Sequence, residues 1–283
     1  MSGLNVSLGY FITVVALGLS CRALLRRWPR LGFLSEWSAS FVLTACLLEV
    51  QTVVEVGQWA GGLGADVSVT LLFAVLLIHG VACGDASGNP TLTLGRFLAL
   101  EATVVPTLLA VAGQFLGAHV ALQAALHYWS LELTDMHLIK SLMASSCSTS
   151  LQVSVLQGFL TEAVSALALH LAHLGLRRRS ALLRVPLIAG LLTFLSQAAS
   201  GYTSAYMNPS LAYGLTFHCP GFTWTEYATV YWLGPLTGMS TALLLYTGHI
   251  PRVFSRNLFY SQKTRFRVPK SGASGEPEDK KKQ

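Results

Sequence analysis

Charged residues are scarce in this sequence. Lys, Arg, Asp and Glu together make up 11% of its 283 residues and hydrophobic residues 52%, whereas about a quarter of a typical soluble domain is charged. A folded chain of this length with so little charge would have an apolar surface, and lipid is the solvent that suits such a surface. The composition therefore predicts an integral membrane protein with the lipid bilayer as its partner.

The sequence also lacks the motifs of catalytic and metal centres. Its eight His residues include no HExxH motif, and its five Cys residues include no CxxC pair. His170 and His173 share a face of one apolar run, but no acidic pair accompanies them. We therefore expect no enzyme activity, no cofactor and no metal site. Cys147 and Cys219 lie in two loops and can form a disulfide only in an oxidising compartment; the alternative is free thiols.

Basic residues form three clusters that give the chain its net charge of +6. They are Arg22–Arg30, Arg177–Arg184 and the segment from Arg252 to the C-terminus. Apolar runs separate the clusters, so there is no solvated basic face and nucleic acid is not expected as a partner. Because Lys and Arg concentrate in cytosolic loops, all three clusters and the C-terminus are expected in the cytosol.

Seven apolar runs are long enough to cross a bilayer as helices. They are Val6–Leu25, Leu31–Val54, Val67–Gly84, Thr107–Trp129, Val155–Gly175, Val185–Tyr202 and Trp224–Gly248. The six spans from Leu31 onward already bring the basic clusters to one side, so the first run is additional. It either spans the membrane with an outside N-terminus, which we favour, or lies in the interface.

Two shorter apolar segments follow Asn-Pro pairs, namely Thr91–Leu100 and Ser210–Phe217. Pro suits the first turn of a helix, so each segment is predicted to begin a helix at its Pro. At about 1.5 Å per residue, a helix this short reaches only about halfway across a hydrocarbon core about 30 Å thick. Both segments are therefore predicted to be re-entrant half-helices.

The chain contains an internal repeat, because three motifs recur in the same order at nearly the same spacing. The pairs are Phe33–Glu36 with Phe159–Glu162, Asn89-Pro90-Thr91 with Asn208-Pro209-Ser210, and Gln114–Gly117 with Pro235–Gly238. Each half has three spans, an odd number, so the halves are inverted relative to each other. The predicted parts are an N-terminal hydrophobic helix and basic linker (1–30), a first repeat (31–129), a connecting loop (130–154), a second repeat (155–248) and a basic cytosolic tail (249–283).

The polar residues of the repeat suggest a pore. Two half-helices that meet at mid-membrane present positive N-termini, and Asn89 and Asn208 can each donate an N–H to a passing neutral solute. Glu36 and Glu162 are expected to face inward and accept hydrogen bonds from the re-entrant loops, or else to form the proton relay of a secondary transporter. Asp85 is expected either to cap the first half-helix or to line the pore as a charge.

Gly88-Asn89-Pro90-Thr91 and Met207-Asn208-Pro209-Ser210 resemble the two NPA boxes of the aquaporin (major intrinsic protein) family. The segments Tyr231–Pro235 and Gln114–Ala118, with the two glutamates, resemble the family at matching places. The resemblance implies an all-α membrane protein with the aquaporin fold: six core transmembrane helices plus two re-entrant half-helices, here with an extra N-terminal helix, and a homotetramer. The residues it implies as structural are Glu36, Glu162, Gln114, Gly117, Gly234, Pro235, Gly238 and Cys219.

The departures from the family pattern point to its unorthodox, or superaquaporin, branch. Thr91 and Ser210 stand where Ala is usual, Leu211 stands where most members have Arg, and Cys219 follows nine residues past the second box. Leu211 and Ala205 are then the selectivity-filter residues. Without the Arg, the pore is expected to pass water, glycerol or hydrogen peroxide, or to be a poorly conducting scaffold. The segments Gly3–Ser7 and Arg256–Tyr260 resemble one subgroup of this branch, which is associated with intracellular membranes.

The last residues of the sequence match the pattern of a retrieval signal. Lys280 and Lys281 lie four and three residues from the chain's last position, counting that position as one, in the spacing of a dilysine signal. Recognition by coat proteins would keep the protein in the endoplasmic reticulum or a secretory vesicle. The alternative is that these lysines only solubilise the tail.

Overall fold

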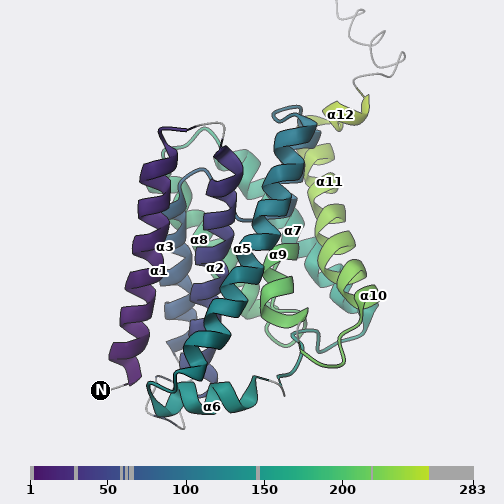
Figure 1. Ribbon diagram of the computed structural model, residues 1–283. Coiled ribbons are helices and arrows are strands. Elements are labelled where there is room, and N and C mark those ends of the chain that lie inside the picture. Colours follow the sequence, from purple (N-terminus) through teal and green to yellow (C-terminus); the bar gives the residue numbers. More distant parts are fainter. Residues whose placement is uncertain are drawn as a thin grey trace, which may run out of the picture.

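The computed structural model describes residues 3–28, 31–57, 60, 63, 67–144, 147–217 and 219–254. Within these residues all the regular structure is helical (Figure 1). The helices are α1 Gly3–Leu25, α2 Gly32–Glu55, α3 Ser68–Cys83, α4 Pro90–Leu98, α5 Val104–Ser130, α6 Asp135–Met143, α7 Val155–Leu176, α8 Ala181–Ala198, α9 Pro209–Ala212, α10 Trp224–Tyr227, α11 Gly234–Thr247 and α12 Pro251–Phe254. A π-helical segment, Tyr213–Phe217, continues α9, and another, Ala228–Leu233, joins α10 to α11.

Among the described residues, five helices are long and apolar enough to cross a membrane, namely α1, α2, α5, α7 and α8. The apolar helix α3 is shorter, and the last predicted span is divided among α10, its π-helical continuation and α11. Each predicted run is therefore helical, but the bounds of the run predicted at Val185–Tyr202 are shifted toward the N-terminus. Helix α8 begins at Ala181 and ends at Ala198, before Tyr202, because the backbone then turns into a loop in which Ser204, Ala205 and Met207 have positive φ angles.

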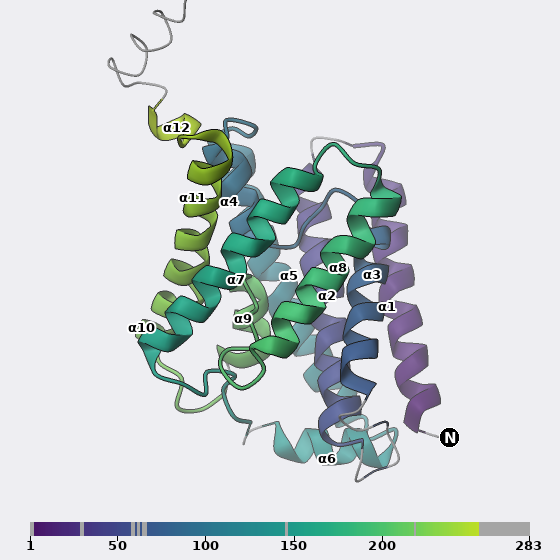
Figure 2. The same cartoon turned by 180° about the vertical axis from the view of Figure 1, so that it is seen from behind.

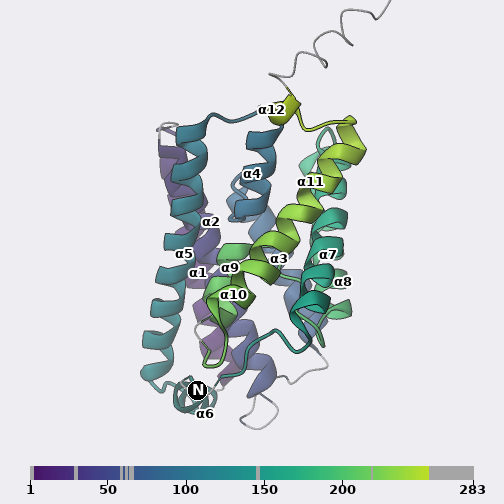
Figure 3. The same cartoon turned by 90° about the vertical axis from the view of Figure 1, so that its right-hand side faces the viewer.

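The two halves of the bundle lie side by side, with α1 outside α2 and α3 (Figures 1 and 2). Seen from the side, α4 and α9 occupy opposite halves of the molecule and begin near its middle (Figure 3). In each half, two helices approach each other closely at a glycine. A Cβ atom at Gly117 would lie 2.3 Å from the Trp37 carbonyl oxygen, and one at Gly238 would lie 2.1 Å from that of Ala163. Any larger residue would therefore push α2 from α5, or α7 from α11.

The predicted connecting loop, residues 130–154, contains a helix that the sequence analysis missed. Helix α6 starts at an N-cap formed by Thr134, whose side chain accepts a hydrogen bond from the His137 N–H. It packs against α5 and α2 and buries Met136 and His137 completely. Its nine residues are too few and too mixed in polarity to resemble a span.

The basic clusters come together at one end of the molecule, as far as they are described. Arg22 donates hydrogen bonds to the Val81 and Ala82 carbonyl groups at the end of α3, and Arg252 donates to those of Phe97 and Ala102. Arg177 forms an ion pair with Glu101 at the same end. Helix α6 lies at the opposite end (Figure 1).

Candidate functional site

The two Asn-Pro pairs begin α4 and α9 in the same way. Each Asn has an extended backbone and is the N-cap of its helix, with Pro in the first turn. Asn89 Oδ1 accepts from the Thr91 N–H at 2.9 Å. Asn208 Oδ1 accepts from the N–H groups of Ser210 at 3.1 Å and Leu211 at 3.2 Å. Both helix starts thus lie at the predicted Pro residues.

Each Asn amide also donates to the opposite half of the chain. Asn89 Nδ2 donates to the Met207 carbonyl oxygen at 3.1 Å, and Asn208 Nδ2 donates to that of Gly88 at 2.9 Å. A side-chain amide has two N–H groups, so each Asn retains a second one. Gly88 is required in this crossing, because its φ is +58° and a Cβ atom would lie 2.8 Å from the Ser40 nitrogen.

The third residue of each box strengthens the same crossing with a hydroxyl group. Thr91 Oγ1 lies 2.9 Å from Asn89 Oδ1 and 3.1 Å from the Met207 oxygen. Ser210 Oγ lies 2.9 Å from Asn208 Oδ1 and 3.4 Å from the Gly88 oxygen. Ala at either position could not make these contacts, so the departure from the usual box adds one hydrogen-bonding group to each half.

The two repeated glutamates hold the re-entrant loops. Glu36 Oε2 accepts from the Gly88 N–H at 2.9 Å and from Gln114 Nε2 at 2.8 Å. Glu162 accepts from the N–H groups of Tyr206 at 3.0 Å and Met207 at 2.7 Å. Both carboxylates are buried, so these bonds replace the water they would otherwise need.

Gly234 and Pro235 lie where the π-helical segment before α11 gives way to α11 itself. A Cβ atom at Gly234 would lie 3.0 Å from both the Glu162 Cβ atom and the Phe159 carbonyl oxygen. Pro235 falls in the first turn of α11, and its missing N–H coincides with the change from the π-helical to the α-helical pattern. The absence of a side chain at Gly234 therefore lets α11 approach α7, the helix that carries Glu162.

One cavity of about 790 Å³ passes the Asn pair. Asn89 and Asn208 both line it, with Ala205 and Leu211 from the second half. Gln51 and Glu55, at the end of α2, line one end of the cavity, and Arg177, at the end of α7, lines the other. The cavity therefore extends toward both ends of the bundle, with the box residues between.

The expected filter residues form an apolar part of the wall. Leu211 packs with Leu43, Leu47 and Leu215, and its side chain offers no hydrogen-bond donor. Ala205 is small and buried. This section of the wall can exclude solutes by size, but it cannot bind them through a side-chain hydrogen bond.

Asp85 lies at the mouth of the cavity. Its carboxylate is almost fully exposed and lies 3.6 Å from Arg184 Nη2. The N-cap of α4 is Asn89, so the geometry fits Asp85 as a charge at the mouth rather than as the cap. Arg177 and Glu101 form a second ion pair there.

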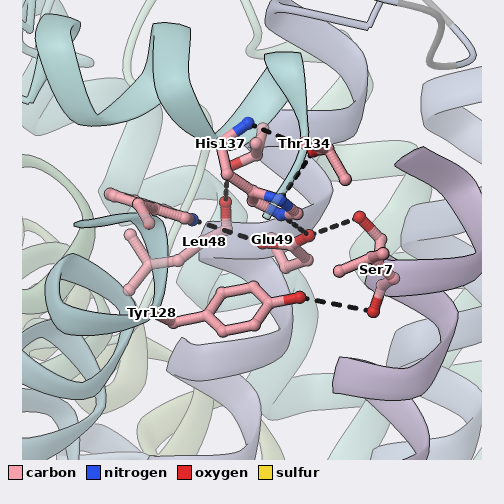
Figure 4. A network of polar contacts seen from close by, with 9 residues as sticks. Ser7, Leu48, Glu49, Tyr128, Thr134 and His137 are labelled. Carbon is pink, nitrogen blue, oxygen red and sulfur yellow. Dashed lines mark hydrogen bonds and ion pairs between the residues drawn. The ribbon is translucent and has the colours of Figure 1, made fainter. Parts of the chain in front are cut away.

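A third buried carboxylate, Glu49, was missed by the sequence analysis (Figure 4). It accepts hydrogen bonds from Ser7 in α1 and from Trp129 Nε1 in α5, and its Oε1 lies 3.0 Å from His137 Nε2 in α6. Thr134 Oγ1 lies 2.7 Å from the other ring nitrogen of His137. The signal was present, since Glu49 is a carboxylate inside an apolar run.

A disulfide joins Cys147 to Cys219, so the paired alternative is confirmed. It links the segment after α6 to the segment after α9, at the end of the molecule opposite the basic clusters. Cys21, Cys46 and Cys83 are free. Lys280 and Lys281 lie outside the described residues.

The chain is similar to known proteins over most of its length. A sequence model of the family described as "Major intrinsic protein" matches residues 29–246. Aquaporin-12 of Mus musculus is 45% identical over 278 residues, covering 97% of this chain and 96% of that protein. Putative aquaporin-12A of Homo sapiens is 44% identical, covering 95% of this chain and 89% of that protein. Aquaporin-11 of Homo sapiens is 29% identical over 87% of this chain and 90% of that protein.

Proposed function

The chain belongs to the major intrinsic protein family, whose members are channels and not enzymes, and on this premise we propose that it conducts water and small neutral solutes such as glycerol and hydrogen peroxide. The observation that carries the proposal is the cavity that both Asn89 and Asn208 line. The relatives support it further, because the chain is similar to aquaporin-12 over nearly its whole length.

In the proposed mechanism, the start of each half-helix repels cations and the Asn amides attract oxygen atoms. The N-termini of α4 and α9 carry partial positive charge. Pro90 and Pro209 fix those starts, and one N–H of each Asn is already used in the crossing. The second N–H of each amide is left for a lone pair of the solute. A neutral solute binds briefly and leaves, whereas a cation or proton meets a barrier.

Leu211 and Ala205 act as the selectivity filter in this proposal. An orthodox Arg at position 211 would narrow the passage and donate hydrogen bonds. Leu provides neither the charge nor the donors, so the filter discriminates mainly by size. The apolar contacts of Leu211 support a filter without side-chain hydrogen-bond donors at this position.

The proposed topology has six core spans and two half-helices in inverted repeats, with α1 as a seventh span and the C-terminus in the cytosol. Two observations support this orientation. The described basic clusters share one end, and the disulfide, which needs an oxidising compartment, lies at the other. We further propose that the protein is a homotetramer in the endoplasmic reticulum or secretory vesicles. Coat proteins would bind its C-terminal tail at Lys280 and Lys281.

Stopped-flow measurements on proteoliposomes test the function. Wild-type protein should raise water and glycerol permeability above that of empty liposomes. Leu192→Trp places a bulky ring at the cavity wall and should lower both fluxes, whereas Leu187→Trp, on the half-exposed side of the same helix, should not. Equal fluxes in empty and protein-containing liposomes would refute the channel proposal. Equal effects of the two Trp variants would refute this cavity as the path.

A further inference from the structure

His170 in α7 gives the cavity wall an imidazole that the equivalent position of the other half lacks. It lies eight residues after Glu162, and the matching position eight residues after Glu36 is Thr44. His170 lines the cavity, whereas Thr44 is fully buried and does not. The two halves therefore place different chemistry at equivalent points.

Glycines in the half-helices lie beneath both side chains. Gly95 and Gly214 each lie six residues after the Asn of their box. A Cβ atom at Gly95 would lie 3.5 Å from His170 Cε1, and one at Gly214 would lie 2.6 Å from Thr44 Cγ2. His170 thus packs over α4 as Thr44 packs over the continuation of α9, and only the imidazole reaches the cavity.

The contacts of Thr91 determine which ring nitrogen of His170 carries hydrogen. The Thr91 hydroxyl has one hydrogen and lies near two oxygens that can only accept, Asn89 Oδ1 and the Met207 carbonyl oxygen. Its third contact is His170 Nε2 at 3.3 Å. If Thr91 donated to His170, both oxygens would face the hydroxyl oxygen without a hydrogen between them. His170 therefore donates from Nε2, and Thr91 accepts.

The other nitrogen, Nδ1, is left as an acceptor. His170 is 4% exposed, and no carboxylate forms an ion pair with it in the part of the chain that the structure describes. A buried charge without a partner is costly, so the ring is neutral and its Nδ1 carries a lone pair. Nδ1 bonds to none of the described residues, and the ring that bears it lines the cavity next to Asn89.

We propose that His170 is a specificity-determining residue whose Nδ1 accepts a hydrogen bond from the solute, so that the pore favours hydroxylated neutral solutes. This inference rests on the proposed channel function. The Asn amides supply donors and His170 supplies an acceptor, a combination that suits a polyol, whose hydroxyl groups both donate and accept. A solute that can only accept hydrogen bonds, such as dimethyl sulfoxide, cannot form one with Nδ1 of His170. The difference arises because a solute entering the constriction loses hydrogen bonds to water, and the wall must replace them.

The test compares glycerol with dimethyl sulfoxide flux in proteoliposomes, after subtraction of flux through empty liposomes. His170→Leu removes both nitrogens with a smaller side chain, and His170→Phe removes them with a larger one. Each should lower the glycerol-to-dimethyl sulfoxide flux ratio by about two- to tenfold, the effect of one lost hydrogen bond. His170→Gln keeps an acceptor and a donor, so it should retain most of the ratio.

Thr44→Val is the matched control, because it changes the equivalent position without altering the cavity wall, and its ratio should equal that of wild type. An unchanged ratio in a conducting His170→Leu protein would overturn the inference. A fall in His170→Phe alone would reflect size and would also overturn it, as would an equal fall in Thr44→Val. A wild-type protein that conducts neither water nor solute would instead refute the channel function, and the inference with it.

Discussion

Replacing Glu49 by Leu should destabilise the protein strongly. The carboxylate is 1% exposed and is shared by donors from three other helices, Ser7, Trp129 and His137. Its removal leaves these buried donors without an acceptor, at a cost of about 1–3 kcal/mol for each group left unsatisfied. At about 2–4 °C per kcal/mol for a chain of roughly this size, the thermal midpoint in detergent should fall by roughly 10 °C.

A double-mutant cycle measures the coupling between Glu49 and His137 separately from the contacts of Glu49 with Ser7 and Trp129. Glu49→Leu with His137→Leu removes both members, so neither side chain is left without its hydrogen-bond partner. The double variant should therefore be more stable than the sum of the two single losses predicts, by about 1–3 kcal/mol of coupling. Midpoints from fluorescence-detected size-exclusion chromatography after heating provide all four measurements.

Glu55→Gln is the control for this cycle. Glu55, the last residue of α2, pairs with Lys140 of α6, the helix that also carries His137. The Glu55 side chain is 53% exposed. Exposed pairs contribute about 0–1 kcal/mol, so the midpoint should fall by no more than a few degrees. The reasoning fails if Glu49→Leu is no worse than Glu55→Gln, or if the losses at Glu49 and His137 are simply additive.

Three further predictions concern the filter, the disulfide and the tail. Leu211→Arg should narrow the passage and lower the glycerol-to-water flux ratio, measured by light scattering; an unchanged ratio would remove Leu211 from the filter. Cys147→Ser should leave Cys219 open to a maleimide mass tag under non-reducing conditions, whereas the wild-type pair should react only after reduction. Tagging of both cysteines in unreduced wild type would contradict the assignment. Replacing Lys280 and Lys281 by Ser should increase surface biotinylation, and unchanged retention would show that another feature keeps the protein inside.

Much of the fold was predictable because only a few kinds of sequence can form helices inside a lipid bilayer. A span needs a long apolar run, and an interrupted half-helix needs a residue such as Pro90 or Pro209 at its start. The partners of Glu36 and Glu162 were predictable in kind, since a buried carboxylate needs donors and the re-entrant loops have unpaired N–H groups.

Other features depend on contacts that sequence spacing does not reveal. Helix α6 is short and of mixed polarity, and it is held in place through the buried Met136 and His137. Glu49 has no matching acid in the second half, so the repeat could not draw attention to it. The role of His170 was hidden for a similar reason, because its contact with Thr91 spans 79 residues of sequence.

The crossed hydrogen bonds of the two boxes determine how much of the chain must be synthesised before the central wall can form. Asn89 must find the Met207 carbonyl group 118 residues later, and Asn208 must find that of Gly88. During synthesis, the first half therefore enters the membrane with the amide of Asn89 and the hydroxyl of Thr91 still lacking the Met207 acceptor that both contact. Neither half can complete the central wall alone, so a ribosome that stops before Met207 leaves an inserted chain without a finished passage.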